Sequence, residues 1–162
     1  MQESTSPKTV LLVEDNPGDV FLLQRACERV GVTEQIQVAR DGEEAFAYLS
    51  GSDEFADRSK YPWPSILITD LKMPKLDGLE LFKQVRSLPG CRDLRVSILC
   101  ASATDAEMSE AALLGVHGVF IKPLKFEEFD GIVKGIFEQT APLRAPFPAS
   151  NQTNLNRGTL SA

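Results

Sequence analysis

Short apolar runs along the chain predict the strands of a sheet. Thr9–Val13, Ser65–Thr69 and Val96–Cys100 are nearly continuous in apolar and β-branched residues. Strands of a parallel sheet have this pattern because helices cover both of their faces. Gln35–Ala39 alternates between polar and apolar residues, which is typical of an outer strand, and Gly118–Ile121 is the last run. The pattern therefore predicts five strands.

Between these runs, apolar residues recur at helical spacing and predict five helices. Asp19 and Asp105 are the expected N-caps of two of them, and Gly31 and Gly115 are the expected stops. The predicted helices are Asp19–Val30, Glu43–Leu49, Leu79–Leu88, Asp105–Leu114 and Phe126–Phe137. Strand and helix thus alternate five times. This order indicates an α/β fold, with a five-stranded parallel sheet that is doubly wound, so that helices lie on both faces.

The remaining segments are polar and lack a period. We expect residues 51–64, which carry two prolines, to form an exposed loop. Residues 1–8 are interpreted as an N-terminal tail. Residues 141–162 are interpreted as a flexible C-terminal tail, because a run rich in Pro, Ser, Asn, Gln and Thr buries too little apolar surface to become ordered. The predicted organisation is one domain, residues 9–140, between two tails.

The composition excludes several functional classes. The net charge of −6 gives an acidic surface that repels phosphate backbones, so we expect no direct contact with nucleic acid. No apolar run approaches the ~20 residues of a membrane span, and the polar N-terminus lacks the apolar stretch of a signal peptide. The three cysteines, Cys27, Cys91 and Cys100, include no pair at metal-ligand spacing. These features predict a cytoplasmic protein with reduced thiols.

Charged residues gather where the predicted central strands end. Glu14 and Asp15 follow the first strand, Asp70 follows the third, and Lys122 follows the fifth. Because parallel sheets form binding sites outside the carboxyl ends of their strands, we expect three carboxylates and one ammonium group to converge. Mg²⁺ would offset the repulsion between the carboxylates, and it prefers oxygen ligands. Asp15 and Asp70 are candidate direct ligands, and Glu14 is a candidate ligand through water. The backbone carbonyl of Lys72 is the fourth candidate.

The predicted site suits phosphoryl transfer. The carboxylate of Asp70 is a nucleophile of the kind that forms aspartyl-phosphates. Transfer requires in-line positioning and neutralisation of charge on the equatorial oxygens of the phosphoryl group. Mg²⁺ supplies part of the neutralising charge, and Lys122, a compact point charge, supplies the rest. We therefore predict that Asp70 is the phosphoacceptor and that Lys122 contacts the phosphate.

Taken together, these motifs resemble the receiver domain of two-component response regulators over about residues 8–138. The resemblance implies a flavodoxin-like receiver fold, Mg²⁺ as the cofactor and a cognate sensor histidine kinase as the phosphodonor. The stretch DLKMPKLDG and the long loop before the third strand are similar to small single-domain receivers that partner bacterial phytochrome kinases. The matching motifs, in chain order, are Glu14-Asp15, Asp70, Met73-Pro74 with Asp77-Gly78, and Lys122-Pro123.

Two positions depart from the receiver pattern. The family usually places Ser or Thr where this chain has Cys100, and an aromatic residue where it has Val119. A thiol is a weaker donor than a hydroxyl, which weakens the case for the usual coupled movement of hydroxyl and ring. Phe120, one place later, is expected to face the opposite side of its strand. Ser102 and Thr104 are the two candidate substitutes for the hydroxyl.

Other notable residues receive structural interpretations. Cys100 is interpreted as a small buried hydrophobe rather than a redox sensor, because neighbouring carboxylates disfavour a thiolate. His117, the single histidine, follows a helix stop and is interpreted as a loop residue. Trp63 is interpreted as a loop anchor or a partner contact, and the partner contact is favoured. The final helix carries more large apolar residues than one face of a sheet absorbs, which predicts a homodimer. These residues are Phe129, Ile132, Val133, Ile136 and Phe137.

The leading functional prediction is a phosphorylation-dependent interaction module that is not an enzyme, beyond self-dephosphorylation at most. The polar segment after Thr140 is too short for an output domain, so we expect the signal to pass to a downstream protein, through dimerisation, or onward to another histidine. One alternative is a receiver-like binding module that is never phosphorylated. A second is an aspartate-nucleophile phosphatase of the haloacid dehalogenase type. Those enzymes use a second carboxylate two residues after the nucleophile, where this chain has Lys72.

Overall fold

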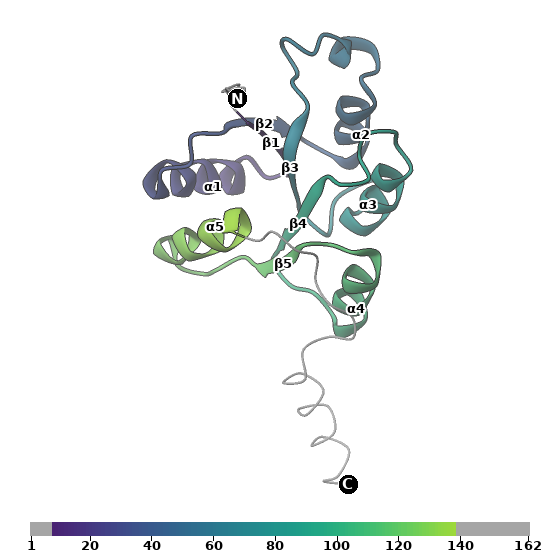
Figure 1. The fold of residues 1–162 in the computed structure, drawn as a ribbon. Helices are drawn as coiled ribbons and strands as arrows, with labels where there is room; N and C mark the ends of the chain where they lie inside the picture. Colours follow the sequence, from purple (N-terminus) through teal and green to yellow (C-terminus); the bar gives the residue numbers. More distant parts are fainter. Residues whose placement is uncertain (1–7, 139–162) are drawn as a thin grey trace, which may run out of the picture.

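The computed structural model describes residues 8–138, which contain one five-stranded parallel sheet in the order β2-β1-β3-β4-β5 (Figure 1). β1 is completely buried, whereas β2 lies at an edge and is partly exposed. The predicted strands and the α/β fold class are confirmed. The strands are β1 (Thr9–Val13), β2 (Gln35–Ala39), β3 (Pro64–Thr69), β4 (Arg95–Cys100) and β5 (Gly118–Ile121).

The two expected tails fall almost entirely outside the described residues. Of the N-terminal tail, residues 1–8, only Lys8 is described, and the C-terminal tail, residues 141–162, is not described at all. The last two residues of the expected domain, 139 and 140, also lie outside. The domain boundaries therefore stay predictions.

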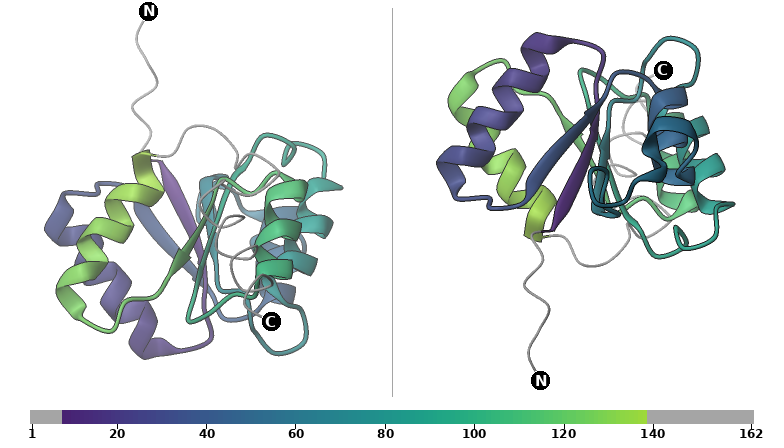
Figure 2. Two further views of the ribbon diagram at one scale, coloured as in Figure 1. Left: turned by 90° about the horizontal axis from the view of Figure 1, so that it is seen from below. Right: turned by 90° about the horizontal axis from the view of Figure 1, so that it is seen from above.

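Helices cover both faces of the sheet: α1 and α5 lie on one face, and α2, α3 and α4 lie on the other (Figure 2). Gly31 and Gly115 end α1 and α4 in the left-handed conformation (φ 82° and 88°), as predicted. None of the described helices is long and apolar enough to span a bilayer. The helices are α1 (Pro17–Val30), α2 (Gly42–Ser50), α3 (Gly78–Arg86), α4 (Asp105–Leu114) and α5 (Phe129–Glu138), with short 3₁₀ helices η1 (Asp53–Ala56) and η2 (Phe126–Glu128).

The sheet divides the core into two apolar clusters. Along β1, Leu11 packs into the cluster beneath α2, α3 and α4, whereas Leu12 packs into the cluster beneath α1 and α5. The division follows from the alternation of side chains along a strand. On β5, Val119 joins the first cluster and Phe120 the second, so the expected opposite orientation of these two residues is confirmed.

Capping contacts determine where two of the helices begin. The side chain of Asn16 accepts hydrogen bonds from two N–H groups in the first turn of α1 and is therefore its N-cap. Thr104 caps α4 in a reciprocal capping box. The predicted caps, Asp19 and Asp105, are wrong: both lie inside the first turn, where their charge interacts favourably with the helix dipole.

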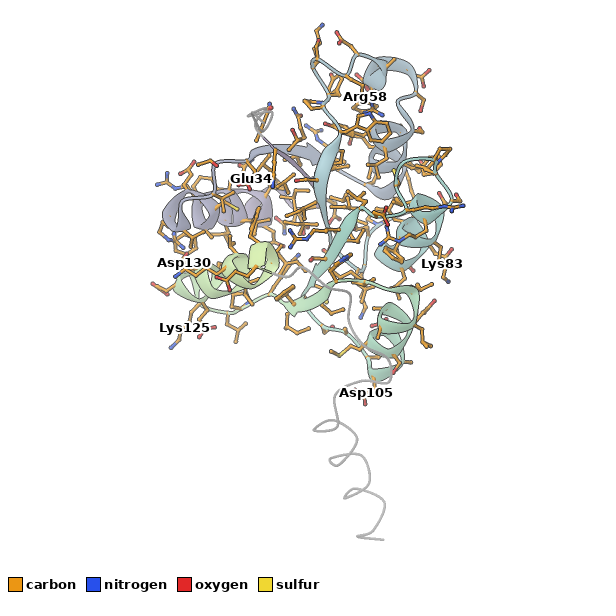
Figure 3. All side chains as sticks on the ribbon, viewed as in Figure 1. Glu34, Arg58, Lys83, Asp105, Lys125 and Asp130 are labelled. Atoms are coloured by element: carbon orange, nitrogen blue, oxygen red, sulfur yellow. The ribbon has the colours of Figure 1, made fainter. Side chains whose placement is uncertain are left out.

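Residues 51–63 are mostly exposed, as expected of a loop, but one buried residue packs the segment against the domain. Phe55 in η1 is buried, with its ring centroid 5.5 Å from that of Tyr48. Arg58 donates a hydrogen bond to the carbonyl oxygen of Tyr48 (2.8 Å), and its guanidinium carbon lies 4.1 Å from the ring centroid of Trp63 (Figure 3). Trp63 itself is half exposed. The aromatic contacts explain the packing, because rings bury large apolar areas even where the sequence has no period.

Most of the apolar face of α5 is covered within the molecule. Phe129, Val133 and Ile136 are buried, and Ile132 and Phe137 pack partly buried against the same cluster. α1 lies beside α5 in both views of Figure 2. Ile132 and Phe137 keep part of their apolar surface exposed, and the homodimer predicted from this helix stays a prediction. Large apolar side chains that are exposed include Phe21, Leu113 and Leu124.

His117 lies in the connection between α4 and β5, as expected of a loop residue, but its side chain is buried. Its Nδ1 accepts a hydrogen bond from the backbone N–H of Val96 at 3.2 Å. Burial, followed by the positive charges of Arg86 and Arg95, lowers the pKa of His117 below its ordinary value of 6.5. The neutral ring is therefore a structural acceptor in this protein.

The buried histidine predicts an acid-sensitive contribution to stability. The pKa of His117 is about 6.5 in the unfolded chain and lower in the folded chain, so below pH 6.5 the unfolded chain binds the proton more readily. The folded state therefore loses stability as the pH falls from 6.5 toward the folded-state pKa. Asn at this position keeps an acceptor oxygen but does not titrate. We expect the free energy of unfolding of the wild type, measured relative to His117→Asn, to decrease between pH 7 and pH 5. A pH-independent difference in urea titrations would contradict this prediction.

Candidate functional site

The parallel pairing of β1 with β3 brings the two acidic strand ends together. Val13 pairs with Thr69, and the N–H of Asp70 donates to the carbonyl oxygen of Val13 at 3.0 Å. Glu14 and Asp15 therefore lie next to Asp70, as the sequence predicted. Their carboxylate oxygens and one from Asp70 all lie within 4.8 Å of one another.

The three carboxylates differ in exposure. Glu14 is buried, Asp15 is exposed, and the side chain of Asp70 is mostly buried. Oxygen atoms at this spacing fit a hard divalent cation, because Mg²⁺ and Mn²⁺ take carboxylate and water oxygens as ligands. Lys72, whose backbone carbonyl is the fourth predicted ligand, lies exposed in the bend just after Asp70. Its ligation stays a prediction.

Lys122 reaches the acidic cluster from the end of β5. Its backbone N–H donates to the carbonyl oxygen of Cys100 (2.7 Å), which continues the β4–β5 pairing. Its Nζ donates to Glu14 Oε2 at 2.8 Å, Asp19 Oδ2 at 2.9 Å and Asp70 Oδ2 at 3.1 Å. The predicted convergence of an ammonium group with the strand-end carboxylates is thus present, and Asp19 is an additional member.

Burial and charge act against each other in this cluster. Burial raises the pKa of Glu14 to about 7, although hydrogen bonds from Lys122 and from the backbone of Asn16 oppose the rise. Burial alone would lower the pKa of Lys122, but its hydrogen bonds to Glu14 and Asp19 outweigh that cost and raise it. Lys122 therefore stays protonated, and the cluster contains one fixed positive charge among several carboxylates.

The carboxylate and the backbone of Asp70 are both fixed. Oδ1 accepts a hydrogen bond from the N–H of Leu71 at 2.7 Å, while Oδ2 accepts from Lys122. The hydroxyl of Thr69 donates to the carbonyl oxygen of Asp70 at 2.8 Å. Gly78 passes so close that a Cβ there would lie 2.3 Å from the same carbonyl oxygen. These contacts orient the carboxylate before any reaction occurs.

Cys100 lies at the end of β4, where receivers usually have a hydroxyl, and is 1% exposed. Burial, followed by the negative charge of Asp70, raises the pKa of its thiol to about 11. Its Sγ lies 3.9 Å from the carbonyl oxygen of Phe120 as a weak donor. The thiol is therefore a protonated, buried group, as expected, and its role in a switch stays a prediction.

The two candidate substitutes for the missing hydroxyl differ in their contacts. Thr104 Oγ1 accepts the N–H of Glu107 at 3.1 Å as the N-cap of α4. Ser102 is exposed. The hydroxyl of Thr104 is therefore used as a helix cap, and Ser102 is the better candidate to replace the missing hydroxyl.

A cleft of about 510 Å³ opens beside the acidic cluster. It lies beside the ends of β1 and β2 and the start of α1, and the exposed Asp15 that follows β1 faces it. Its walls are formed by Glu14, Asp15, Pro17, Val20, Val38 and Arg40.

The doubly wound parallel sheet, with carboxylates and a lysine at its strand ends, is the arrangement expected of a receiver domain. Residues 10–134 match the family described as the response regulator receiver domain, and this chain belongs to that family. The resemblance inferred from the sequence is therefore confirmed.

The relatives include response regulators of phytochrome signalling. The chain is 36% identical to the probable methanogenesis regulatory protein FilR2 of Methanothrix harundinacea, over 91% of this chain and 93% of that protein. It is 28% identical to the phosphorylated cyanobacterial phytochrome response regulator RcpA (TM-score 0.73; 85% of this chain, 99% of that one). It is 26% identical to the Mn²⁺-bound form of Rcp1, a Synechocystis response regulator (TM-score 0.73; 84% and 99%). This chain is a receiver homologous to such regulators.

Proposed function

We propose that this chain accepts a phosphoryl group on Asp70 in a Mg²⁺-dependent reaction and signals through phosphorylation-dependent contacts with other proteins. The observation that carries the proposal is the position of the Asp70 carboxylate. It lies within 4.8 Å of two other carboxylates and 3.1 Å from the Nζ of Lys122. A nucleophile so placed has both a cation site and a fixed positive charge beside it, as phosphoryl transfer requires.

Each residue of the site has a distinct task in this proposal. Asp15, Asp70 and the carbonyl of Lys72 would hold Mg²⁺ directly and Glu14 through water, and the bound ion would neutralise charge on the transferring phosphoryl group. A carboxylate oxygen of Asp70 forms a bond to phosphorus as the bond from phosphorus to the donor nitrogen breaks. The departing imidazole keeps the electron pair of that bond and takes up a proton. Lys122 turns an N–H toward a phosphoryl oxygen and stabilises the aspartyl-phosphate electrostatically.

The relatives support a particular partner. RcpA is described as a phytochrome response regulator, and it matches 85% of this chain. We therefore propose that the phosphodonor is a cognate sensor histidine kinase of the phytochrome type. We propose that the protein acts in the cytoplasm by protein contact. The acidic composition supports the absence of direct binding to nucleic acid. Homodimerisation, a downstream protein and a second phosphotransfer histidine are the proposed routes for the output.

The two alternative functions lack support of this kind. A phosphatase of the haloacid dehalogenase type needs a second carboxylate two residues after the nucleophile, and Lys72 occupies that position. A receiver-like module that is never phosphorylated has no need for Lys122 to contact three carboxylates in a mostly buried position. We therefore favour a phosphoacceptor that is not an enzyme in its own right.

The proposal predicts that the full-length protein takes up one phosphoryl group in a metal-dependent reaction. Incubation with acetyl phosphate and Mg²⁺ should add the mass of one phosphoryl group, and chelation of the metal with EDTA should prevent the addition. Mn²⁺ should replace Mg²⁺, since both take oxygen ligands. Intact-mass spectrometry makes the measurement. Labelling that is equally fast in EDTA, or no labelling with either metal, would refute the proposal.

A further inference from the structure

Asp19 contacts the site from a helix rather than from a strand end. It lies in the first turn of α1, and its Oδ2 accepts a hydrogen bond from the Nζ of Lys122 at 2.9 Å. Glu14 and Asp70 accept the other two, at 2.8 and 3.1 Å. An ammonium group has three N–H donors. All three donors of Lys122 are therefore occupied by carboxylates.

A fully occupied Lys122 must give up one acceptor before it can contact a phosphoryl group. The side chain of Glu14 is 5% exposed and its other oxygen accepts the N–H of Asn16. Asp70 is held through its other oxygen by the N–H of Leu71. Asp19 is 32% exposed, and Lys122 is the only hydrogen-bond partner of its carboxylate within residues 8–138. Water can therefore replace Lys122 at Asp19 most readily.

We propose that Asp19 is a positioning residue that tethers Lys122 in the unphosphorylated protein and releases it when the phosphoryl group arrives. The inference rests on the proposed function of Asp70. One N–H of Lys122 passes from Asp19 to a phosphoryl oxygen, while the carboxylate of Asp19 becomes hydrated. No covalent bond changes in this step. Asp19 thus competes with the phosphoryl group for the same donor and slows phosphorylation.

Removal of the tether should speed phosphorylation. In Asp19→Ala, the third N–H of Lys122 is left directed toward the open side of the site. We expect the phosphoryl adduct to form about two- to fivefold faster from acetyl phosphate with saturating Mg²⁺, the range typical of a partly exposed ion pair. Asp19→Glu keeps a carboxylate and should react at nearly the wild-type rate. Glu28→Gln removes a charge from the exposed side of α1, where Glu28 pairs with Arg25, and should not change the rate.

Asp19→Ala removes a negative charge from the site as well as a hydrogen bond to Lys122, and the effects of these two losses must be distinguished. Field effects between exposed charges are largely screened at an ionic strength of about 0.5 M, whereas a direct hydrogen bond in a mostly buried cluster is screened much less. The gain in Asp19→Ala should therefore persist at high salt. In the metal-free protein, NMR should also show faster hydrogen exchange at the ammonium group of Lys122 in Asp19→Ala than in the wild type.

The outcomes separate this inference from the proposed function. Labelling of the wild type with no gain in Asp19→Ala, or with a gain that disappears at high salt, would overturn the tether alone. Unchanged ammonium exchange would do the same. If the wild type takes up no phosphoryl group, the proposed function fails and the release step fails with it. Thermal unfolding of Asp19→Ala close to that of the wild type would show that the fold is intact.

Discussion

Asp70→Asn is expected to abolish phosphoryl labelling by acetyl phosphate and Mg²⁺. The amide nitrogen and oxygen of Asn are not nucleophiles of the required kind, and the substitution also removes a negatively charged oxygen from the predicted metal site. Asn retains an oxygen that can accept the N–H of Leu71, as Oδ1 of Asp70 does at 2.7 Å. The fold should therefore survive, and intact-mass spectrometry should find unmodified protein under conditions that label the wild type.

Asp77→Asn is the matched control for this loss. Asp77 is an exposed carboxylate in the same connection after β3, and its Oδ1 caps α3 by accepting the N–H of Glu80 at 2.8 Å. Asn is about as good an N-cap as Asp, so this variant should fold and be labelled normally. An adduct that persists in Asp70→Asn would place the phosphoacceptor elsewhere in the chain.

The strand-end part of the site could be predicted because it depends only on the order of elements. Once the alternation of strands and helices indicates a parallel sheet, residues that follow the strands must meet at one edge. The positions of Glu14, Asp15 and Asp70 followed from this arrangement of the strands. The position of Lys122 also required the recognition of a fifth strand. The pairing of Val13 with Thr69 then fixes the proximity of the acidic residues.

Asp19 could not be assigned in the same way. Helical periodicity indicates which residues face the core, but it does not indicate which first-turn residue faces the end of a neighbouring strand. The choice of cap also misled the prediction. Asn16 and Asp19 are both favoured N-cap types, and only the hydrogen bonds from the first-turn N–H groups show that Asn16 is the cap. That arrangement leaves the carboxylate of Asp19 available to Lys122.

The burial of two residues could not be predicted from the sequence, for a common physical reason. Phe55 and His117 lie in connections without a period. The ring of Phe55 packs against that of Tyr48, and the buried ring of His117 accepts a hydrogen bond from the backbone of Val96. Local patterns carry no information on such contacts. Cys100 and Val119, in contrast, lie on strands, where alternation alone determines the face that each side chain takes.

Gly78→Ala is expected to lower the free energy of unfolding by about 1–3 kcal/mol, the usual cost of inserting an atom into a well-packed site. A Cβ would lie 2.3 Å from the carbonyl oxygen of Asp70 and 3.2 Å from the Cα of Leu71. Both neighbours are backbone atoms that cannot rotate away, so the connection between β3 and α3 must shift. Because Asp70 belongs to that connection, phosphoryl labelling should slow as well.

Gly131→Ala provides the matched control, since the same atom is added at a position with no neighbour within 4 Å. Gly131 lies inside α5, where Ala is favoured over Gly by roughly 0.5–1 kcal/mol, so this variant should be slightly more stable than the wild type. Urea titrations of both variants measure the contrast. If Gly78→Ala matched Gly131→Ala in stability and in labelling rate, the close approach to Asp70 would not constrain the phosphoacceptor, and its orientation would have to depend on Thr69, Leu71 and Lys122 alone.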